Sequence, residues 1–122
     1  MIKLIFCLTR RNDVPFEEFS RIWRDEHGPL VVSFAATLGI RRYVQVHTIE
    51  PQANVLLAES RGAPAPFDGI AELWFDDREA LDAAATSPDG RAAGAVLAED
   101  ERRFIDHAHS PIFLAEEHAF IA

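Results

Sequence analysis

Four short apolar segments with the composition of β-strands restrict the fold of this chain more than any other feature of its sequence. They occupy residues 2–9, 40–47, 68–75 and 111–121. Helical periodicity over 15–27 lies between the first two segments, and helical stretches over 78–85 and 88–105 lie between the last two. Residues 48–66 contain three prolines, one glycine and no clean period, so we expect a long loop there with one turn of helix at 55–58.

The resulting order, β-α-β-β-α-β, is that of the ferredoxin-like fold. It predicts a single α+β domain over residues 1–122, with a four-stranded antiparallel sheet and helices on one face only. The other face would stay exposed although the strands are apolar, and a second copy related by a two-fold axis is its simplest cover. We therefore expect a homodimer in which two sheets enclose a dimeric α/β barrel.

Start and stop signals give the expected helix limits. Pro15 suits a first helical turn, and Gly28-Pro29 is expected to end that helix, because proline has no N–H donor and disfavours helix in the residue before it. A short helix over 30–38 would then end at Gly39. Asp76, with Glu79 three residues later, predicts a capping box at the start of the next helix.

His27 stands at the predicted end of the first helix and is the first candidate for chemistry. It lies four residues after Trp23 and eight after Phe19, on the apolar edge of that helix. A helix C-terminus favours the protonated imidazole whereas burial opposes it, so this side chain is suited to proton transfer near neutral pH. The alternative is a histidine that only caps the last carbonyls of its helix.

The second strand segment has one polar face, formed by Arg41, Tyr43, Gln45 and His47. This face either meets solvent or lines a polar cavity, and the pattern slightly favours solvent.

Glu72 is the one charge inside the third strand segment, and it shares a face with Ile70 and Trp74. A carboxylate partly covered by an aromatic ring is prepared for general acid or base chemistry unless it is paired. A salt bridge to an arginine is the alternative.

Net charge and cysteine content narrow the class of protein. The formal net charge of −8 argues against a nucleic acid or an anionic membrane as partner. Cys7 is the one cysteine, which excludes an internal disulfide and fits a reducing cytoplasm. The apolar start of the chain is too short to span a membrane and lacks the features of a signal peptide. We expect a cytoplasmic protein.

Several possible metal ligands gather near the C-terminus: Asp106, His107, His109 and His118. Zinc or iron could use them, but their spacing matches no strong metal signature and the His-x-His pair precedes a turn. Haem, with His27 or His47 as axial ligand, is a further alternative. The expectation is a protein that uses neither metal nor other cofactor.

Four linked segments resemble the EthD-domain family. Residues 23–31 resemble its W-x3-HGPL signature, and residues 68–77 are similar to its DG-aELWFD segment. Residues 104–106 and 113–118 resemble its closing F-D and final-strand segments. The similarity covers nearly the whole chain in the same order. It implies a dimeric α/β-barrel fold with a small-molecule pocket between helices and sheet in each subunit.

The resemblance also implies small-molecule chemistry, such as ether degradation and dehydration or ring-modifying steps on polyketides and aromatic compounds. Related barrels include cofactor-free monooxygenases, isomerases, cyclases and haem-handling enzymes, so the fold leaves the reaction open. We expect a cofactor-free lyase, isomerase, cyclase or oxygenase for a hydrophobic, oxygenated substrate of aromatic, polyketide-like or xenobiotic type. The alternative is a non-catalytic binding or accessory protein of a catabolic pathway.

In this hypothesis His27 transfers the proton, while Tyr43 and Glu72 hydrogen-bond a substrate carbonyl or phenol or orient the imidazole. The expected substrate-binding residues are Trp23, Phe34, Trp74 and His47.

Overall fold

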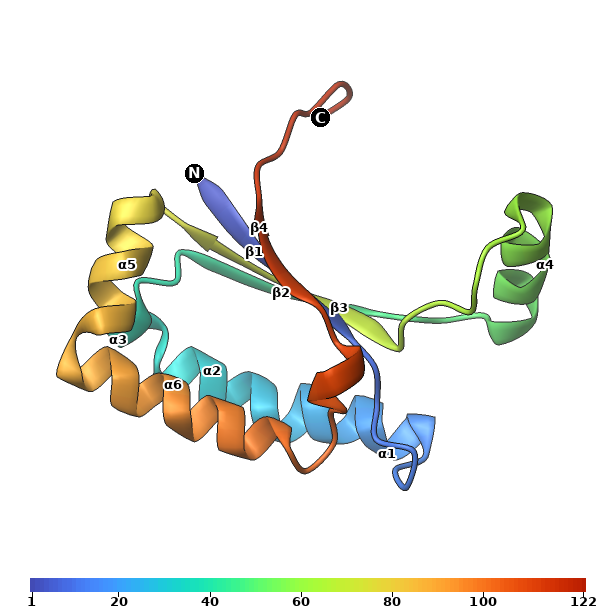
Figure 1. The fold of residues 1–122 in the computed structure, drawn as a ribbon, viewed down its shortest axis with the longest axis horizontal. Helices are drawn as coiled ribbons and strands as arrows, with labels where there is room; N and C mark the ends of the chain where they lie inside the picture. Colours follow the sequence, from blue (N-terminus) through green and yellow to red (C-terminus); the bar gives the residue numbers. More distant parts are fainter.

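The computed structural model describes all residues from Met1 to Ala122 and contains one four-stranded antiparallel sheet (Figure 1). Its strands are β1 (Ile2–Leu8), β2 (Arg42–His47), β3 (Gly69–Phe75) and β4 (Ile112–Ala115). They lie in the order β2-β3-β1-β4, so β1 pairs with both β3 and β4. The predicted α+β, ferredoxin-like architecture is confirmed.

Helices cover one face of this sheet, and Figure 1 shows the N-terminal helices and the last long helix together below it. The N-terminal rod consists of α1 (Phe16–Arg21), a π-helical segment (Ile22–His27) and α2 (Gly28–Ser33), followed by the single turn α3 (Ala35–Leu38). The second pair is α5 (Arg78–Thr86) and α6 (Pro88–Glu101), and a 3₁₀ turn (His107–His109) precedes β4. None of the helices combines the length and apolar character that crossing a bilayer would require.

The prediction that Gly28-Pro29 ends the first helix is wrong. The chain stays helical through both residues, and the Gly28 N–H donates to the Trp23 carbonyl five residues earlier. This wider π turn relieves the clash that a proline ring makes with the carbonyl four residues before it. The Trp23 carbonyl also accepts from Gln45 Nε2 at 2.8 Å. His27 therefore lies inside a continuous rod and does not face a free helix end.

The segment 48–66 is a second correction, because it contains the helix α4 (Pro51–Arg61) instead of a loop with one turn. Pro51 occupies its first turn, and Gly62, with a φ of 61°, ends it in the left-handed conformation. In Figure 1, α4 stands away from the sheet at the end of two extended segments. Its apolar side chains are exposed, and Leu56 retains 68% of its surface.

The core between sheet and helices is built on aromatic packing. Phe19, Trp23 and Phe104 are fully buried, with ring centroids 5.7–5.8 Å from Phe19 to the other two. The Trp23 indole lies directly on Gly69, where an added Cβ would be 2.4 Å from Trp23 Cζ3. The rod and the start of β3 are thus in contact because residue 69 has no side chain.

Several element limits differ from the sequence expectation, and α6, for example, ends at Glu101 instead of residue 105. β4 ends at Ala115, not at residue 121, because Ala115 already pairs with Lys3 and β1 has almost no residues left to pair with a longer strand. The cap of α5 is Asp77, whose carboxylate accepts from the Ala80 N–H at 2.7 Å. Asp76 instead pairs with Arg41 at 2.9 Å.

Candidate active site

The polar face of β2 points toward the helices, not toward solvent as the pattern favoured. Tyr43 and Gln45 contact each other, and Gln45 and His47 reach the π segment and α1. The register explains this, because Tyr43 pairs with Leu73 and Gln45 pairs with Ala71, which also face the helices. Buried polar groups need partners, and each of these side chains has one.

A cavity of about 520 Å³ lies between this face of the sheet and the helical layer. Most of its wall is apolar, and four titratable side chains also contribute to it. These four are His27, Tyr43, Glu101 and His107. Trp23, Leu73 and Leu97 are among the apolar residues that enclose it. An apolar cavity with a few convergent polar groups is the usual form of a small-molecule site.

His27 is held in one orientation by α6. Its Nδ1 lies 2.8 Å from Asp100 Oδ2, and its ring meets the edge of Phe104 with centroids 5.3 Å apart. Because a carboxylate only accepts, Nδ1 carries the proton and Nε2 of the neutral ring keeps its lone pair. Nε2 is 3.6 Å from Glu101 Oε2, beyond a direct hydrogen bond. The imidazole is buried, with 4% of the residue exposed.

Asp100 is kept ionised by its neighbours. Burial alone raises the pKa of its carboxyl group, but hydrogen bonds from Arg103 and His27 outweigh burial and lower that pKa. Arg103 Nε donates to Asp100 Oδ1 at 2.9 Å, and Arg103 also reaches Glu26. A fixed negative charge behind His27 stabilises the imidazolium that forms when Nε2 accepts a proton.

Glu101 connects His27 to a second histidine. Its Oε1 lies 3.0 Å from His107 Nε2, while its Oε2 faces His27. The His107 ring stacks on Phe6 with the two planes 13° apart. Asp100, His27, Glu101 and His107 therefore lie in one row, in which hydrogen bonds join Asp100 to His27 and Glu101 to His107. The middle pair, His27 and Glu101, is 3.6 Å apart, too far for a direct hydrogen bond.

A second row of hydrogen bonds fixes Tyr43. Gln45 Nε2 donates to the Trp23 carbonyl and to Tyr43 Oη, both at 2.8 Å, so Gln45 Oε1 is the acceptor for His47 Nε2–H. Ser20 Oγ must then donate to His47 Nδ1, 3.0 Å away. Since Tyr43 Oη accepts from Gln45, its own proton is free for a ligand in the cavity.

The titration behaviour of this row agrees with these directions. Burial, with a smaller contribution from the charge of Arg24, lowers the pKa of His47 and keeps it neutral. Burial also raises the pKa of Tyr43, so its hydroxyl stays protonated and can act as a hydrogen-bond donor.

The structure separates Glu72 and Trp74 from His27. Both lie on the opposite, open face of the sheet, where Glu72 Oε1 pairs with Lys3 Nζ at 2.8 Å. The sequence predicted an arginine as the alternative salt-bridge partner of Glu72, and in the structure the partner is Lys3. Trp74 lies under Lys3 and Arg42, and its Nε1–H donates to Glu117. The carboxylates that flank His27 come from α6 instead.

Of the other three expected site residues, one lines the cavity and two do not. Trp23 lines the cavity, whereas His47 lies behind Gln45, with its ring centroid 4.4 Å from the Trp23 ring centroid. Phe34, at the junction of α2 and α3, is half-buried and does not line the cavity.

The C-terminal histidines do not converge. His109 pairs with Asp106 and His118 with Glu116, while His107 belongs to the row described above. No group of three or more potential metal ligands comes together anywhere in the chain.

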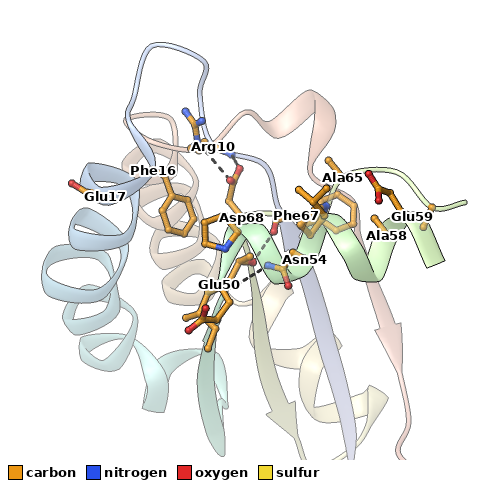
Figure 2. Close-up of a pocket in the computed structure, with 16 residues that line it drawn as sticks. Arg10, Phe16, Glu17, Glu50, Asn54, Ala58, Glu59, Ala65, Phe67 and Asp68 are labelled. Atoms are coloured by element: carbon orange, nitrogen blue, oxygen red, sulfur yellow. Dashed lines mark hydrogen bonds and ion pairs between the residues drawn. The ribbon is translucent and has the colours of Figure 1, made fainter. Parts of the chain in front are cut away.

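A larger hollow of about 810 Å³ lies between α4 and the β1–α1 connection. Figure 2 shows Phe16, Asn54 and Phe67 around it and the contact between Arg10 and Asp68. It contains no histidine, and Asp68 is engaged by the Arg10 backbone N–H at 2.8 Å. The His27 cavity, which brings two histidines and a carboxylate together, is therefore the candidate active site.

Sequence reasoning missed Asp100 and Glu101 as site residues. It named His107 only as a possible metal ligand, and it placed Gln45 only on a strand face that could line a polar cavity. Two adjacent carboxylates near the end of a helix look like solvated surface, and only tertiary packing brings them against His27. The sequence did contain one signal for the site. Gln45 lies between Tyr43 and His47 on the same face of a strand, and three such side chains can hydrogen-bond to one another.

Comparison with solved structures supports the fold. An EthD family protein from Bacillus halodurans is 22% identical, with a TM-score of 0.64 over 97% of this chain and 99% of that one. A dimeric protein of unknown function with a ferredoxin-like fold from Bacteroides fragilis is 20% identical, with a TM-score of 0.58 over 95% of each chain. SnoaB, a cofactor-independent oxygenase from Streptomyces nogalater, is 13% identical, with a TM-score of 0.57 over 98% of this chain and 95% of that one.

A search of curated protein sequences finds no match. The profile of the EthD domain, in contrast, matches residues 11–108, which include the rod, β2, α4, β3 and the α5–α6 pair. That match covers both His27 and the carboxylates beside it. This chain therefore belongs to the EthD family.

Proposed function

We propose that this protein is a cofactor-independent enzyme that removes a proton from an apolar, oxygenated substrate bound in the His27 cavity. The observation that carries the proposal is the Asp100–His27 pair, 2.8 Å apart, at the wall of a largely apolar cavity. A buried imidazole with one nitrogen held by a carboxylate and the other facing a cavity is a general base in its active tautomer.

The first step follows from this geometry. His27 Nε2 takes a proton from an acidic C–H or O–H of the substrate and becomes an imidazolium, which the Asp100 carboxylate stabilises. The electron pair left on the substrate is delocalised into its carbonyl or phenol oxygen. The Tyr43 hydroxyl, whose raised pKa keeps it protonated, donates to that oxygen.

The substrate class follows from the cavity wall. Apolar side chains predominate, and the polar groups include the His27 base and the Tyr43 hydroxyl donor. This suits an aromatic or polyketide-like ketone, phenol or lactone with one activated hydrogen. The resulting enolate or phenolate can then eliminate, rearrange or react with oxygen. The likeness to SnoaB, described as a cofactor-independent oxygenase, supports a reaction of this kind without a cofactor.

Exchange of substrate hydrogen for deuterium tests the proton transfer without knowledge of the product. Wild-type protein is incubated in D₂O under argon with anthrone, a β-diketone or an unsaturated lactone, and loss of the acidic C–H signal is followed by NMR. We expect exchange that His27→Gln slows by about 100-fold or more.

His118→Gln is the matched control, because His118 is exposed and lies away from the cavity. It should exchange like the wild type. Equal exchange by wild type and His27→Gln would remove His27 from the mechanism. Binding of these compounds without any exchange would favour the alternative, a non-catalytic binding or accessory protein.

We also propose that the protein works as a homodimer built on the open face of the sheet. Val46 and Phe113 on that face retain 44% and 49% of their surface, and Ile5 and Ile70 lie between them in the register. An exposed apolar sheet face of this kind needs a partner. The likeness to a Bacteroides fragilis structure described as dimeric supports this assembly.

Val46→Glu tests the interface by sedimentation, with Val96→Glu as the control. Val96 on α6 has 45% exposure, matched to Val46, but lies on the helical side. Only Val46→Glu should shift the protein toward monomer. A monomeric wild type at micromolar concentration would contradict the proposed dimer.

A further inference from the structure

The burial of His27 leaves its imidazole without a direct route for proton release to solvent. A base that takes a proton in each turnover must lose it again, yet only 4% of His27 is exposed. The Nδ1 side gives no good exit, because Asp100 is bound to Arg103, which remains protonated in proteins. The lowered pKa of Asp100 also makes its carboxylate a poor acceptor.

The Nε2 side leads to the surface through two further groups. Glu101 Oε2 lies 3.6 Å from His27 Nε2, and Glu101 Oε1 lies 3.0 Å from His107 Nε2. Exposure rises along this path, from 5% of the His27 side chain to 17% for Glu101 and 33% for His107. His107 lines both the cavity and a separate surface hollow, which it shares with Arg11, Arg102 and Asp106.

We propose that Glu101 and His107 form a proton relay that carries the substrate proton from His27 to solvent. The relay rests on the proposed function of His27 as a base. It assigns Glu101 and His107 as positioning and proton-carrying residues, which need not touch the substrate.

The transfers balance without any oxidant or reductant. The proton leaves Nε2 of the His27 imidazolium for the Glu101 carboxylate, after an approach of the two groups or through one bridging water. In the resting state His107 Nε2–H donates to the Glu101 carboxylate. Once Glu101 is protonated, His107 exchanges through solvent to the tautomer that carries its proton on Nδ1, and the Glu101 carboxyl group turns and gives its proton to the unprotonated Nε2. His107 then releases its Nδ1 proton to solvent. His27 and Glu101 return to their starting charges, and the stacking of His107 on Phe6 holds its ring in line.

A substrate-free measurement tests whether the three groups act on one another. NMR titration follows the imidazole C–H signals of His27 and His107 in wild type, Glu101→Gln, His107→Gln and His109→Gln. Removal of the Glu101 charge should move the titration of both histidines to lower pH by at least about 0.5 pH unit. Removal of His107 should move that of His27 to higher pH, because one nearby positive charge is lost. His109→Gln, an exposed control paired with Asp106, should change neither. Independent titration of His27 and His107 in every variant would overturn the relay.

Turnover provides the second readout, with anthrone as the carbon acid. With protein in excess, the first deprotonation should stay within about three-fold of wild type in His107→Gln, because the base is intact. Steady-state exchange in dilute buffer should fall about ten-fold or more and should recover when imidazole is added. Unchanged steady-state exchange in His107→Gln would refute the relay while leaving His27 as base. Loss of the first deprotonation in Glu101→Gln, with His27→Gln active, would instead refute the proposed function and make Glu101 the base.

Discussion

The contact between Trp23 and Gly69 makes a sharp prediction for Gly69→Ala. A Cβ at residue 69 would lie 2.4 Å from Trp23 Cζ3, 2.8 Å from Cη2 and 3.0 Å from the Val46 carbonyl oxygen. Ordinary van der Waals contact begins at 3.4 Å, so the indole would have to move by about 1 Å. It has no room to do so, because Trp23 is fully buried between Phe19 and His47.

The expected loss of stability in Gly69→Ala can be worked out from typical energies of overpacking and of chain entropy. Overpacking of a buried site costs about 1–3 kcal/mol, and a site this rigid belongs near the upper end. Alanine lowers the entropy of the unfolded chain relative to glycine, which offsets about 0.5–1 kcal/mol. We expect a net loss of about 2 kcal/mol in the free energy of unfolding, or roughly 8 °C in Tm for a chain of this size.

Urea unfolding at one protein concentration, followed by circular dichroism, measures this loss. Gly94→Ala is the matched control, since a Cβ there meets nothing within 4 Å and α6 should gain about 0.5–1 kcal/mol. Trp23→Phe should weaken the effect of Gly69→Ala, with a coupling of about 1 kcal/mol in the double-mutant cycle. The packing argument would be refuted if the free energy of unfolding of Gly69→Ala lay within about 0.5 kcal/mol of the wild-type value. That difference is roughly the effect of a neutral surface substitution.

Three further predictions follow from the pKa shifts. Tyr43 is the one tyrosine, so absorbance near 295 nm reports its ionisation alone. In the native protein its pKa should lie above the ordinary value of about 10, and in urea it should return to that value. The free energy of unfolding should fall as pH rises past 10. Asp100 has a lowered folded pKa, so its stabilising effect is present above about pH 4 and is lost as pH falls further. The stability gap between wild type and Asp100→Asn should therefore be widest at pH 7 and close toward pH 3, and a constant gap would contradict this. Burial raises the pKa of Cys7, so a thiol reagent at pH 8 should modify it much more slowly in the native protein than in urea.

Strand order and helix placement could be predicted because they depend on local patterns. The apolar segments around Ile5 and Leu73 have the length and composition of strands, and their order allows few arrangements. The missed helix α4 had its own signals, with Pro51 at the start and Gly62 just after the end. Its exposed apolar side chains hide the usual amphipathic period, so the prolines in this segment favour a loop in the sequence.

The site was harder to predict because it depends on which face of each strand meets the helices. The sequence predicted both Glu72 and Tyr43 as catalytic residues, yet the two side chains lie on opposite faces of the sheet. A shift of one residue in register would exchange these positions. The partners of His27 come from a helix more than seventy residues later in the chain, and no local pattern connects them.

The π turn in the N-terminal rod ties the position of His27 to the length of one helix. Deletion of a single residue between Trp23 and His27 would still leave a sequence able to form a regular helix. Every side chain after the deletion would then turn by about 100° around the helix axis relative to those before it. The rod could keep its indole on Gly69 or its imidazole on Asp100, but not both. The helical phase of the rod, as well as the identity of its residues, thus decides whether both side chains reach these positions.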